Sequence, residues 1–303
     1  MKRRTFLAAS TAAVCGAVSE SLIVADEKVP GEKLIDIHQH THYHGRSDDG
    51  LRQHQRALGA SKTVLLPAGS QYGLEANCYG NDSALALVKQ FPKEFVFFAN
   101  ELPDLPETRQ VLEKYLKLGA KGIGEQKFFV DCDSSAIELI ATIAREHRVP
   151  VLLHFQHGKY NQGFERFHRV LEKFPQVNFI AHAQTTWGNI DRDHEQAVLY
   201  PKGKLTPGGL TDRWLADYAN FYADLSAGSG LNAMQRDEDF TRGFLQRHQN
   251  KLLYGSDCQD VDTKAKECCG IRMLELVRRL APSQAVKHKI LFENAQRVLR
   301  IKA

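Results

Sequence analysis

Residues that could bind a metal ion stand at the ends of five short apolar runs. The first run carries the motif H-x-H, and each later run ends in a single histidine or carboxylate. Such side chains are costly to bury one at a time, but burial becomes favourable when they converge on a divalent cation. The candidates are His38 and His40 in LIDIHQH, Glu125 in AKGIGEQKF, His154 in VPVLLHF, His182 in VNFIAH and Asp257 in LLYGSD. The pattern indicates a metalloenzyme.

Each candidate also has an interpretation without a metal. His38 and His40 would project from the same face of a strand, although HQHTHYH could also be a surface cluster of histidines. His154 and His182 could be buried histidines with ordinary hydrogen-bond partners. Asp257 could cap a helix, because Ser and Asp after Gly often begin one. The shared position at the ends of apolar runs favours the metal site.

Apolar runs rich in strand-forming residues alternate with amphipathic stretches along the chain. Residues 105–118, 134–147 and 162–174 have apolar side chains at three- and four-residue spacings, which predicts helices. Eight such units predict an α/β fold, a (β/α)8 TIM barrel that forms one domain over residues 33–302. An open doubly wound sheet is the alternative, but no G-x-G-x-x-G follows the first strand. The predicted strands are 34–38, 63–67, 95–100, 121–127, 149–154, 177–182, 221–225 and 251–255.

Catalysis in a TIM barrel takes place at the carboxyl ends of the strands, where all the candidates would lie. The long segment 183–220, rich in Gly, Pro and polar residues, would be the loop after strand six. Long loops on that face are often lids or specificity elements. A solvated insertion is the alternative.

The N-terminus has the charge pattern of an export signal. Arg3 and Arg4 precede an apolar stretch with no acidic residue before Glu20, which predicts a twin-arginine (Tat-type) signal peptide over residues 1–25. An amphipathic first helix is the alternative. We expect a periplasmic or otherwise exported protein. Lipoprotein anchoring at Cys15 is not expected, because Val14 stands where a small residue is needed.

Composition excludes several classes of partner. The net charge of +4 falls to +2 without residues 1–25, since 37 basic and 35 acidic side chains remain, and no basic tract argues for nucleic acid. Beyond the signal, no apolar run is long enough for a stable membrane span. Five cysteines remain after Cys15, and no C-x-x-C pair occurs. They are predicted to be free buried thiols, and Cys258 is assigned to packing.

The chain resembles the amidohydrolase superfamily. The resemblance lies in H-x-H on strand one, histidines on strands five and six and aspartate on strand eight. The segments PVLLH, NFIAH and YGSD most resemble sequences of the amidohydrolase-2 branch, which consists of metal-dependent TIM-barrel hydrolases. The resemblance extends over residues 34–299. The resemblance implies that His38, His40, His154 and Asp257 bind one or two divalent ions, with zinc expected, and that His182 binds a second ion or polarises the substrate.

Strand four leaves two candidates for the bridging ligand. Glu125 and Lys127 in GIGEQKF would share a face, and the superfamily uses either a glutamate or a carboxylated lysine there. The Gly-Glu pair in this segment is similar to that of the TatD-type deoxyribonucleases, in which the glutamate is a metal ligand. We favour Glu125, with Lys127 as a substrate contact. An ion pair between the two inside the barrel is the alternative.

The resemblance implies hydrolysis of a small ester, lactone or amide. A metal ion would activate water, Asp257 would act as general base, and His182 would stabilise charge on the substrate oxygen. The alternatives are a metal-dependent decarboxylase or hydratase, and an exported barrel that only binds its ligand. We expect a small-molecule substrate, whose identity the sequence leaves open together with the oligomeric state. Candidate pocket residues are Arg46, Tyr72, Tyr160, Trp187 and Arg192.

Overall fold

The computed structural model describes residues 31–69, 77–261 and 268–302. The predicted signal peptide and Tyr72 lie outside these residues. The described part of the chain contains no helix that is long and apolar enough to cross a membrane.

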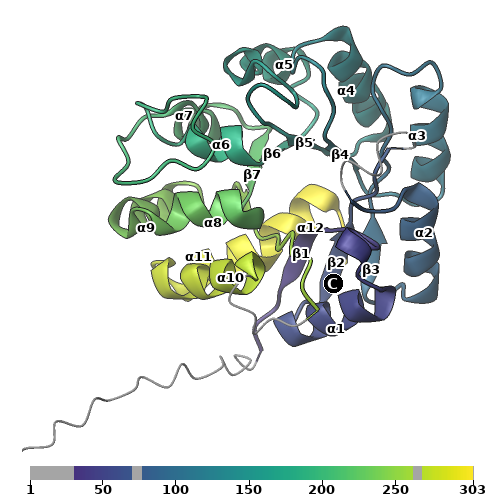
Figure 1. Cartoon of the computed structure of the whole chain (residues 1–303), viewed down its shortest axis with the longest axis horizontal. Coiled ribbons are helices and arrows are strands. Elements are labelled where there is room, and N and C mark those ends of the chain that lie inside the picture. The colour runs from purple at the N-terminus through teal and green to yellow at the C-terminus, as the bar shows by residue number, and fades with distance from the viewer. Residues whose placement is uncertain (1–30, 70–76, 262–267, 303) are drawn as a thin grey trace, which may run out of the picture.

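Strands and helices alternate as predicted, and the helices lie outside the strands (Figure 1). The strands are β1 (Ile35–Gln39), β2 (Lys62–Leu65), β3 (Phe95–Phe97), β4 (Ile123–Gln126), β5 (Val151–His154), β6 (Phe179–His182), β7 (Phe221–Asp224) and β8 (Leu252–Leu253). All eight fall within or next to the predicted runs. The chain is a TIM barrel, which confirms the predicted fold.

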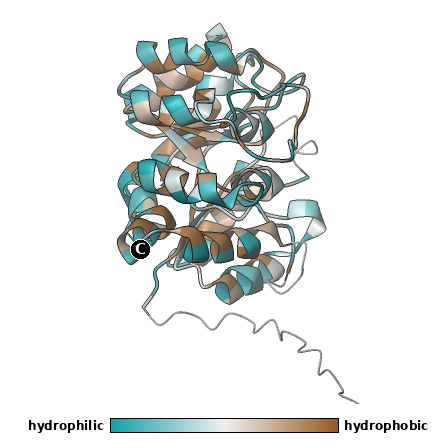
Figure 2. Ribbon diagram, turned by 90° about the vertical axis from the view of Figure 1, so that its left-hand side faces the viewer, coloured by the Kyte–Doolittle hydropathy of each residue, from teal (hydrophilic) through white to brown (hydrophobic). Residues whose placement is uncertain are grey.

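The helices that follow the strands bury one face each. They are α1 (Asp48–Leu58), α2 (Asn81–Gln90), α3 (Thr108–Lys117), α4 (Ser135–His147), α5 (His168–Lys173), α6 (Gln184–Gly188), α7 (Leu210–Asp217), α8 (Ala227–Gln235), α9 (Glu238–Arg247), α10 (Cys269–Leu280), α11 (Gln284–His288) and α12 (Asn294–Leu299). Short turns of other helix types lie at Tyr43–Gly45, Phe164–Arg166 and Lys289–Glu293. Hydrophilic and hydrophobic residues alternate around the helices in Figure 2, as expected for helices packed on a barrel.

Two helix boundaries show the expected local causes. The side chain of Ser134 caps α4 by accepting a hydrogen bond from the backbone amide of Ile137. Helix α3 ends just before Gly119, whose φ of 106° is favourable only for glycine. The third predicted helix is shorter than expected, because Gln162 pairs with Asp131 and Phe164–Arg166 form a 3-10 turn before α5 begins.

The strands pair in parallel as two arcs, β1–β3 and β4–β8. A single bridge between Ala99 and Ile123 joins β3 to β4, and the amide of Ile37 donates to the carbonyl of Tyr254 (3.1 Å) beside β8. Backbone hydrogen bonds close the ring at both seams, and three of them cross from β3 to β4, with Lys121 donating to Phe97, Ala99 to Gly122 and Gly124 to Ala99 (2.8–2.9 Å). Within the second arc, His154 and His182 are register partners, which places their side chains next to each other.

Two layers of apolar side chains hold the barrel together. The larger layer lies between strands and helices and includes Leu153, Phe179 and Phe221. The inner layer combines barrel residues such as Ile37 and Ile180 with residues of α12, so this helix covers one end of the barrel. The segment 183–220 contains α6 and α7 and is not one unstructured loop.

Candidate metal centre

The predicted ligand residues meet at the carboxyl ends of the strands. The Nε2 atoms of His38 and His40 are 3.2 Å apart. Glu125 Oε2 lies 3.6 Å from His38 Nε2 and 3.7 Å from His40 Nε2. Asp257 Oδ1 lies 3.7 and 3.5 Å from the same two nitrogens. His182 Nε2 is 3.7 Å from both Glu125 Oε1 and Asp257 Oδ2. The five side chains therefore surround one small volume.

Partners behind the histidines fix which nitrogen faces that volume. His38 Nδ1 donates to Asp224 Oδ2 (2.7 Å), and His40 Nδ1 donates to the carbonyl of Leu66 (2.7 Å). His182 Nδ1 lies 3.2 Å from Asp224 Oδ2. Carboxylate and carbonyl oxygens only accept hydrogen bonds, so His38 and His40 carry their ring protons on Nδ1. Their Nε2 atoms point toward the other candidate ligands, as in many metal sites.

The resulting cluster consists of acceptors. Neutral His38 and His40 would present two Nε2 lone pairs 3.2 Å apart, with two carboxylates beside them. Asp257 Oδ1 is buried and has no hydrogen-bond partner among the described residues. Acceptors at such distances repel one another unless a cation lies between them. This donor set of imidazole nitrogens and carboxylate oxygens fits a divalent metal ion.

When protons are the only cations available, they collect on the histidines. Burial opposes protonation of His38, but the charges of Asp257 and Asp224 outweigh burial and raise its pKa well above the usual value. Burial also opposes protonation of His40, but Cys78 and Asp257 raise its pKa to about 10. Burial would raise the pKa of Glu125, but His154 and His38 hold it well below the usual range. The carboxylates therefore stay ionised and ready to bind a cation.

His154 is placed differently from the other histidines. Its Nδ1 lies 2.5 Å from Glu125 Oε1, so His154 orients the carboxylate. Its Nε2 is buried without a hydrogen-bond partner among the described residues. Burial lowers the pKa of His154 to about 4, although Glu125 opposes this effect. His154 is thus neutral near pH 7, with Nε2 available as a ligand atom.

The backbone around β8 holds Asp257 in place. Its amide donates to the carbonyl of His38 (2.9 Å), and its φ of 47° lies in the left-handed region, which Asp adopts more readily than most residues. No described helix begins at Asp257, so the helix-cap interpretation does not hold. Two residues earlier, a Cβ on Gly255 would lie 2.6 Å from Asp224 Oδ1 and 2.9 Å from His38 Cβ. Only glycine fits there.

Asp224 and Tyr43 also belong to the site, although neither was predicted from the sequence. Asp224 ends β7 and is fully buried, and its Oδ2 also accepts from Ser226 Oγ (2.7 Å). The run FYAD has the same apolar pattern with a terminal carboxylate as the chosen runs, so the signal was present. The ring of Tyr43 lies 4.7 Å from that of His40, and the negative charge of Asp257 together with burial raises its phenol pKa. Tyr43 therefore stays a neutral hydrogen-bond donor beside the centre.

Lys127 lies beside the same carboxylates. Burial opposes its charge, but Glu125 and Asp257 raise its pKa, so the ammonium group stays charged. Its Nζ is 5.6 Å from the ring centroid of Tyr160, whose ring is 5.3 Å from that of His154. Among the described residues, the ion pairs of Glu125 are all with histidines. The predicted alternative of a Glu125–Lys127 ion pair is therefore wrong.

The other predicted pocket residues lie elsewhere or have structural partners. Arg46 is buried and donates to the carbonyl of Cys258 (2.7 Å) and to the side chain of Gln39. Trp187 lies in the core, and its indole N–H donates to the carbonyl of Asp224 (3.0 Å). The side chain of Arg192 is 64% exposed. Arg46 and Trp187 thus support the segments that carry Asp257 and Asp224, respectively.

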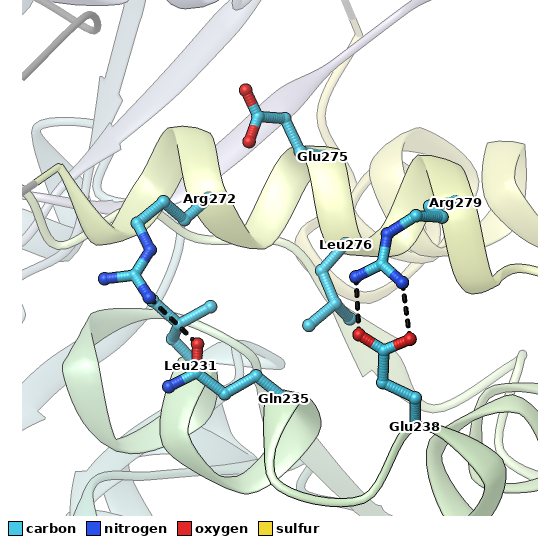
Figure 3. A pocket seen from close by; sticks show the side chains of 7 residues that line it. All are labelled: Leu231, Gln235, Glu238, Arg272, Glu275, Leu276 and Arg279. Atoms are coloured by element: carbon cyan, nitrogen blue, oxygen red, sulfur yellow. Dashed lines mark hydrogen bonds and ion pairs between the residues drawn. The ribbon is translucent and has the colours of Figure 1, made fainter. Parts of the chain in front are cut away.

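A surface pocket of about 380 Å³ lies between α8 and α10 (Figure 3). Its charged groups are mostly paired, with Arg279 donating to Glu238 (2.7 Å) and Arg272 donating to Gln235 (3.0 Å). The side chain of Glu275 points away from these pairs. None of the candidate metal-binding residues lines this pocket.

Comparison with known proteins agrees with the fold. The sequence model of a family described as amidohydrolase matches residues 35–301. No curated protein matches the chain significantly. An uncharacterized TIM-barrel protein from Bordetella bronchiseptica is similar in structure, with a TM-score of 0.62, 14% identity and coverage of 88% of this chain and 98% of that one.

Two further solved structures share the fold. A candidate 2-pyrone-4,6-dicarboxylic acid hydrolase from Pseudomonas putida has a TM-score of 0.60 and 16% identity, covering 89% of this chain and 98% of that one. The 2,6-dihydroxybenzoate decarboxylase from Rhizobium has a TM-score of 0.56 and 13% identity, covering 89% of this chain and 99% of that one. At these identities, the likeness concerns the fold.

Proposed function

Because the chain belongs to the amidohydrolase family, we propose that it is a metal-dependent hydrolase of a small ester, lactone or amide. The observation that carries the proposal is the acceptor cluster, in which His38 and His40 direct Nε2 atoms at each other and at two carboxylates. His38, His40, Glu125 and Asp257 would hold the ion, together with His182. We expect zinc, and His154 Nε2 is available should a second ion bind.

The protein groups suit hydrolysis. A bound divalent ion would lower the pKa of water and polarise the electrophile. Asp257 would take the proton from that water and pass it to the leaving group. His182, held by Asp224 at 3.2 Å, would stabilise negative charge on the substrate oxygen. Lys127 would pair with an anionic group of the substrate, since it is charged and lies beside the centre.

A decarboxylase is the second candidate. Two features support it: the fold is shared with a 2,6-dihydroxybenzoate decarboxylase, and Lys127 is a cation that could bind a carboxylate. Loss of CO₂ from aromatic or unsaturated acids, without ester or lactone hydrolysis, would favour this candidate. Stoichiometric metal with no turnover on either substrate class would favour a barrel that only binds its ligand.

Metal content tests the proposal most directly. The purified protein should hold one or two equivalents of a divalent ion, and Glu125→Ala should lose at least one of them. Hydrolysis of a panel of esters, lactones and amides should be lost in the same variant. Asp212→Asn is a matched control, because Asp212 also accepts from a histidine, His248 Nε2 at 2.6 Å, outside the centre. Metal content unchanged by Glu125→Ala would remove Glu125 from the site.

A further inference from the structure

Three sulfur and nitrogen atoms meet next to the candidate metal centre but are not part of it. Cys258 follows Asp257 directly, Cys268 stands just before α10, and His54 lies on the buried face of α1. The Sγ atoms of the two cysteines are 3.0 Å apart, and His54 Nε2 is 3.4 Å from Cys268 Sγ. All three side chains are buried. This thiol cluster could bind a second type of metal ion or form a disulfide.

The spacing of the sulfurs does not suit a metal ion. Two thiolates on one tetrahedral zinc, each with a Zn–S bond of about 2.3 Å, lie about 3.8 Å apart. The observed 3.0 Å is well below that spacing. The two sulfurs are also closer than non-bonded sulfur atoms normally lie. Both cysteines are free thiols in the structure, and 3.0 Å is also longer than an S–S bond of about 2.05 Å, so forming the bond would draw the two sulfurs together by about 1 Å.

The hydrogen bonds of His54 give an independent argument. The amide nitrogen of Gln55 donates both to Asp36 Oδ2 (3.0 Å) and to His54 Nδ1 (3.1 Å), while its oxygen accepts from Thr63 (2.8 Å). The carboxylate of Asp36 thus fixes the orientation of the amide. His54 Nδ1 is then an acceptor, and the ring proton sits on Nε2, facing Cys268. A protonated Nε2 cannot be a metal ligand.

We propose that Cys258 and Cys268 are joined by a disulfide in the mature protein. The oxidant is a small-molecule or protein disulfide. The thiolate of one cysteine attacks a sulfur of the oxidant, whose other sulfur leaves as a thiolate. The thiolate of the second cysteine then attacks the first cysteine in the mixed disulfide and releases the second thiolate of the oxidant. Two protons and two electrons leave the pair, and the oxidant becomes two thiols.

Because neither sulfur is accessible once α1 and α10 have packed, the exchange requires these helices to separate, either before folding is complete or by local opening of the exported protein. The bond would tie the segment after β8 to the start of α10. The same segment is already held by Arg46, which donates to the carbonyl of Cys258 (2.7 Å). If Asp257 binds the metal as proposed above, the disulfide keeps this carboxylate in position. Cys258 and Cys268 are free buried thiols in the structure, which confirms the prediction from the sequence, and the proposed bond goes beyond it.

Peptide mapping tests the bond without reference to metal or activity. The chain is produced with export to a bacterial periplasm and purified without reductant. It is then denatured in the presence of an alkylating agent and digested with trypsin. Lys264 and Lys266 stand between the two cysteines, so cleavage separates their peptides unless a disulfide joins them. We expect the joined peptide in the wild type. It should persist in Cys269→Ser, which excludes the neighbouring thiol, and should be absent in Cys268→Ser.

Two results would overturn the proposal. One is alkylation of both Cys258 and Cys268 when the unreduced protein is denatured in the presence of the alkylating agent. The other is a zinc equivalent that is lost in both Cys258→Ser and Cys268→Ser but kept in Asp257→Asn, which would make the cluster a metal site.

The effect on the metal centre is tested separately. Cys268→Ser should release its divalent ion to a chelator about tenfold faster than the wild type, as for loss of other groups that support ligands. Cys132→Ser is the matched control, since Cys132 is also buried but contacts the carbonyl of Gly163. Equal release from the two variants would show that the bond does not support Asp257. A wild type without any metal would instead contradict the proposed function and leave the mapped bond intact.

Discussion

Asp224 should control metal affinity although it is not expected to touch the ion. Its Oδ2 accepts from His38 Nδ1 (2.7 Å) and Ser226 Oγ (2.7 Å) and lies 3.2 Å from His182 Nδ1. Asp224→Asn removes the negative charge that keeps the ring protons on Nδ1. Both histidines could then carry a proton on Nε2, where the ion should bind. Loss of one such supporting carboxylate typically weakens metal binding 10- to 100-fold, or about 1.4–2.7 kcal/mol.

The assay is competition for zinc against a chromogenic chelator at fixed pH. Asp212→Asn is the control, because it breaks a similar Asp–His pair, Asp212 with His248, away from the centre. Thermal unfolding of the metal-free proteins shows whether each variant is folded. We expect weaker zinc binding in Asp224→Asn and unchanged binding in Asp212→Asn. Equal affinities in Asp224→Asn and the wild type would refute the idea that Asp224 orients the ligands.

Three further predictions concern other groups. Trp187→Phe should lower the free energy of unfolding by about 1 kcal/mol through loss of one buried hydrogen bond, with KM unchanged; a raised KM would restore Trp187 as a substrate contact. Burial would raise the pKa of Glu32, but Arg278 and Lys287 lower it below 4.5. Glu32→Gln should therefore cost about 1–2 kcal/mol in denaturant unfolding at neutral pH, and this difference should shrink as the pH falls through the lowered pKa. Finally, since the metal-free pKa of His40 is about 10, zinc binding must displace its proton. Affinity should rise by about tenfold per pH unit for each displaced proton, and calorimetry in buffers of different ionisation enthalpy should detect proton release.

The fold could be predicted because its signals are local. Each barrel strand is an apolar run with a length set by the barrel, and α3 and α4 have recognisable ends at Gly119 and Ser134. The ligand positions followed from the same pattern, since the carboxyl ends of parallel strands share one face. His38, His40, Glu125 and Asp257 indeed lie within 3.7 Å of a neighbour in that set.

Roles within the site depend on distances that the sequence does not contain. Nothing in VPVLLH indicates that His154 would turn Nδ1 toward Glu125, while His38 and His40 use Nε2 for the centre. The part played by Trp187 also depends on packing, because an aromatic residue after a strand can face either the pocket or the core. The contact of Cys258 with Cys268 joins two positions whose approach only the folded backbone determines.

A metal ion bound at the candidate centre would also connect the two arcs of the barrel. His38 and His40 belong to the arc β1–β3, whereas Glu125, His182 and Asp257 come from the arc β4–β8 or its end. An ion held by both groups would add a cross-link to the β8–β1 seam, where Ile37 donates to Tyr254 and Asp257 donates to His38. Metal binding and the stability of the barrel would then be coupled. Removal of the ion should therefore open the barrel at the β8–β1 seam before the helices of either arc unfold.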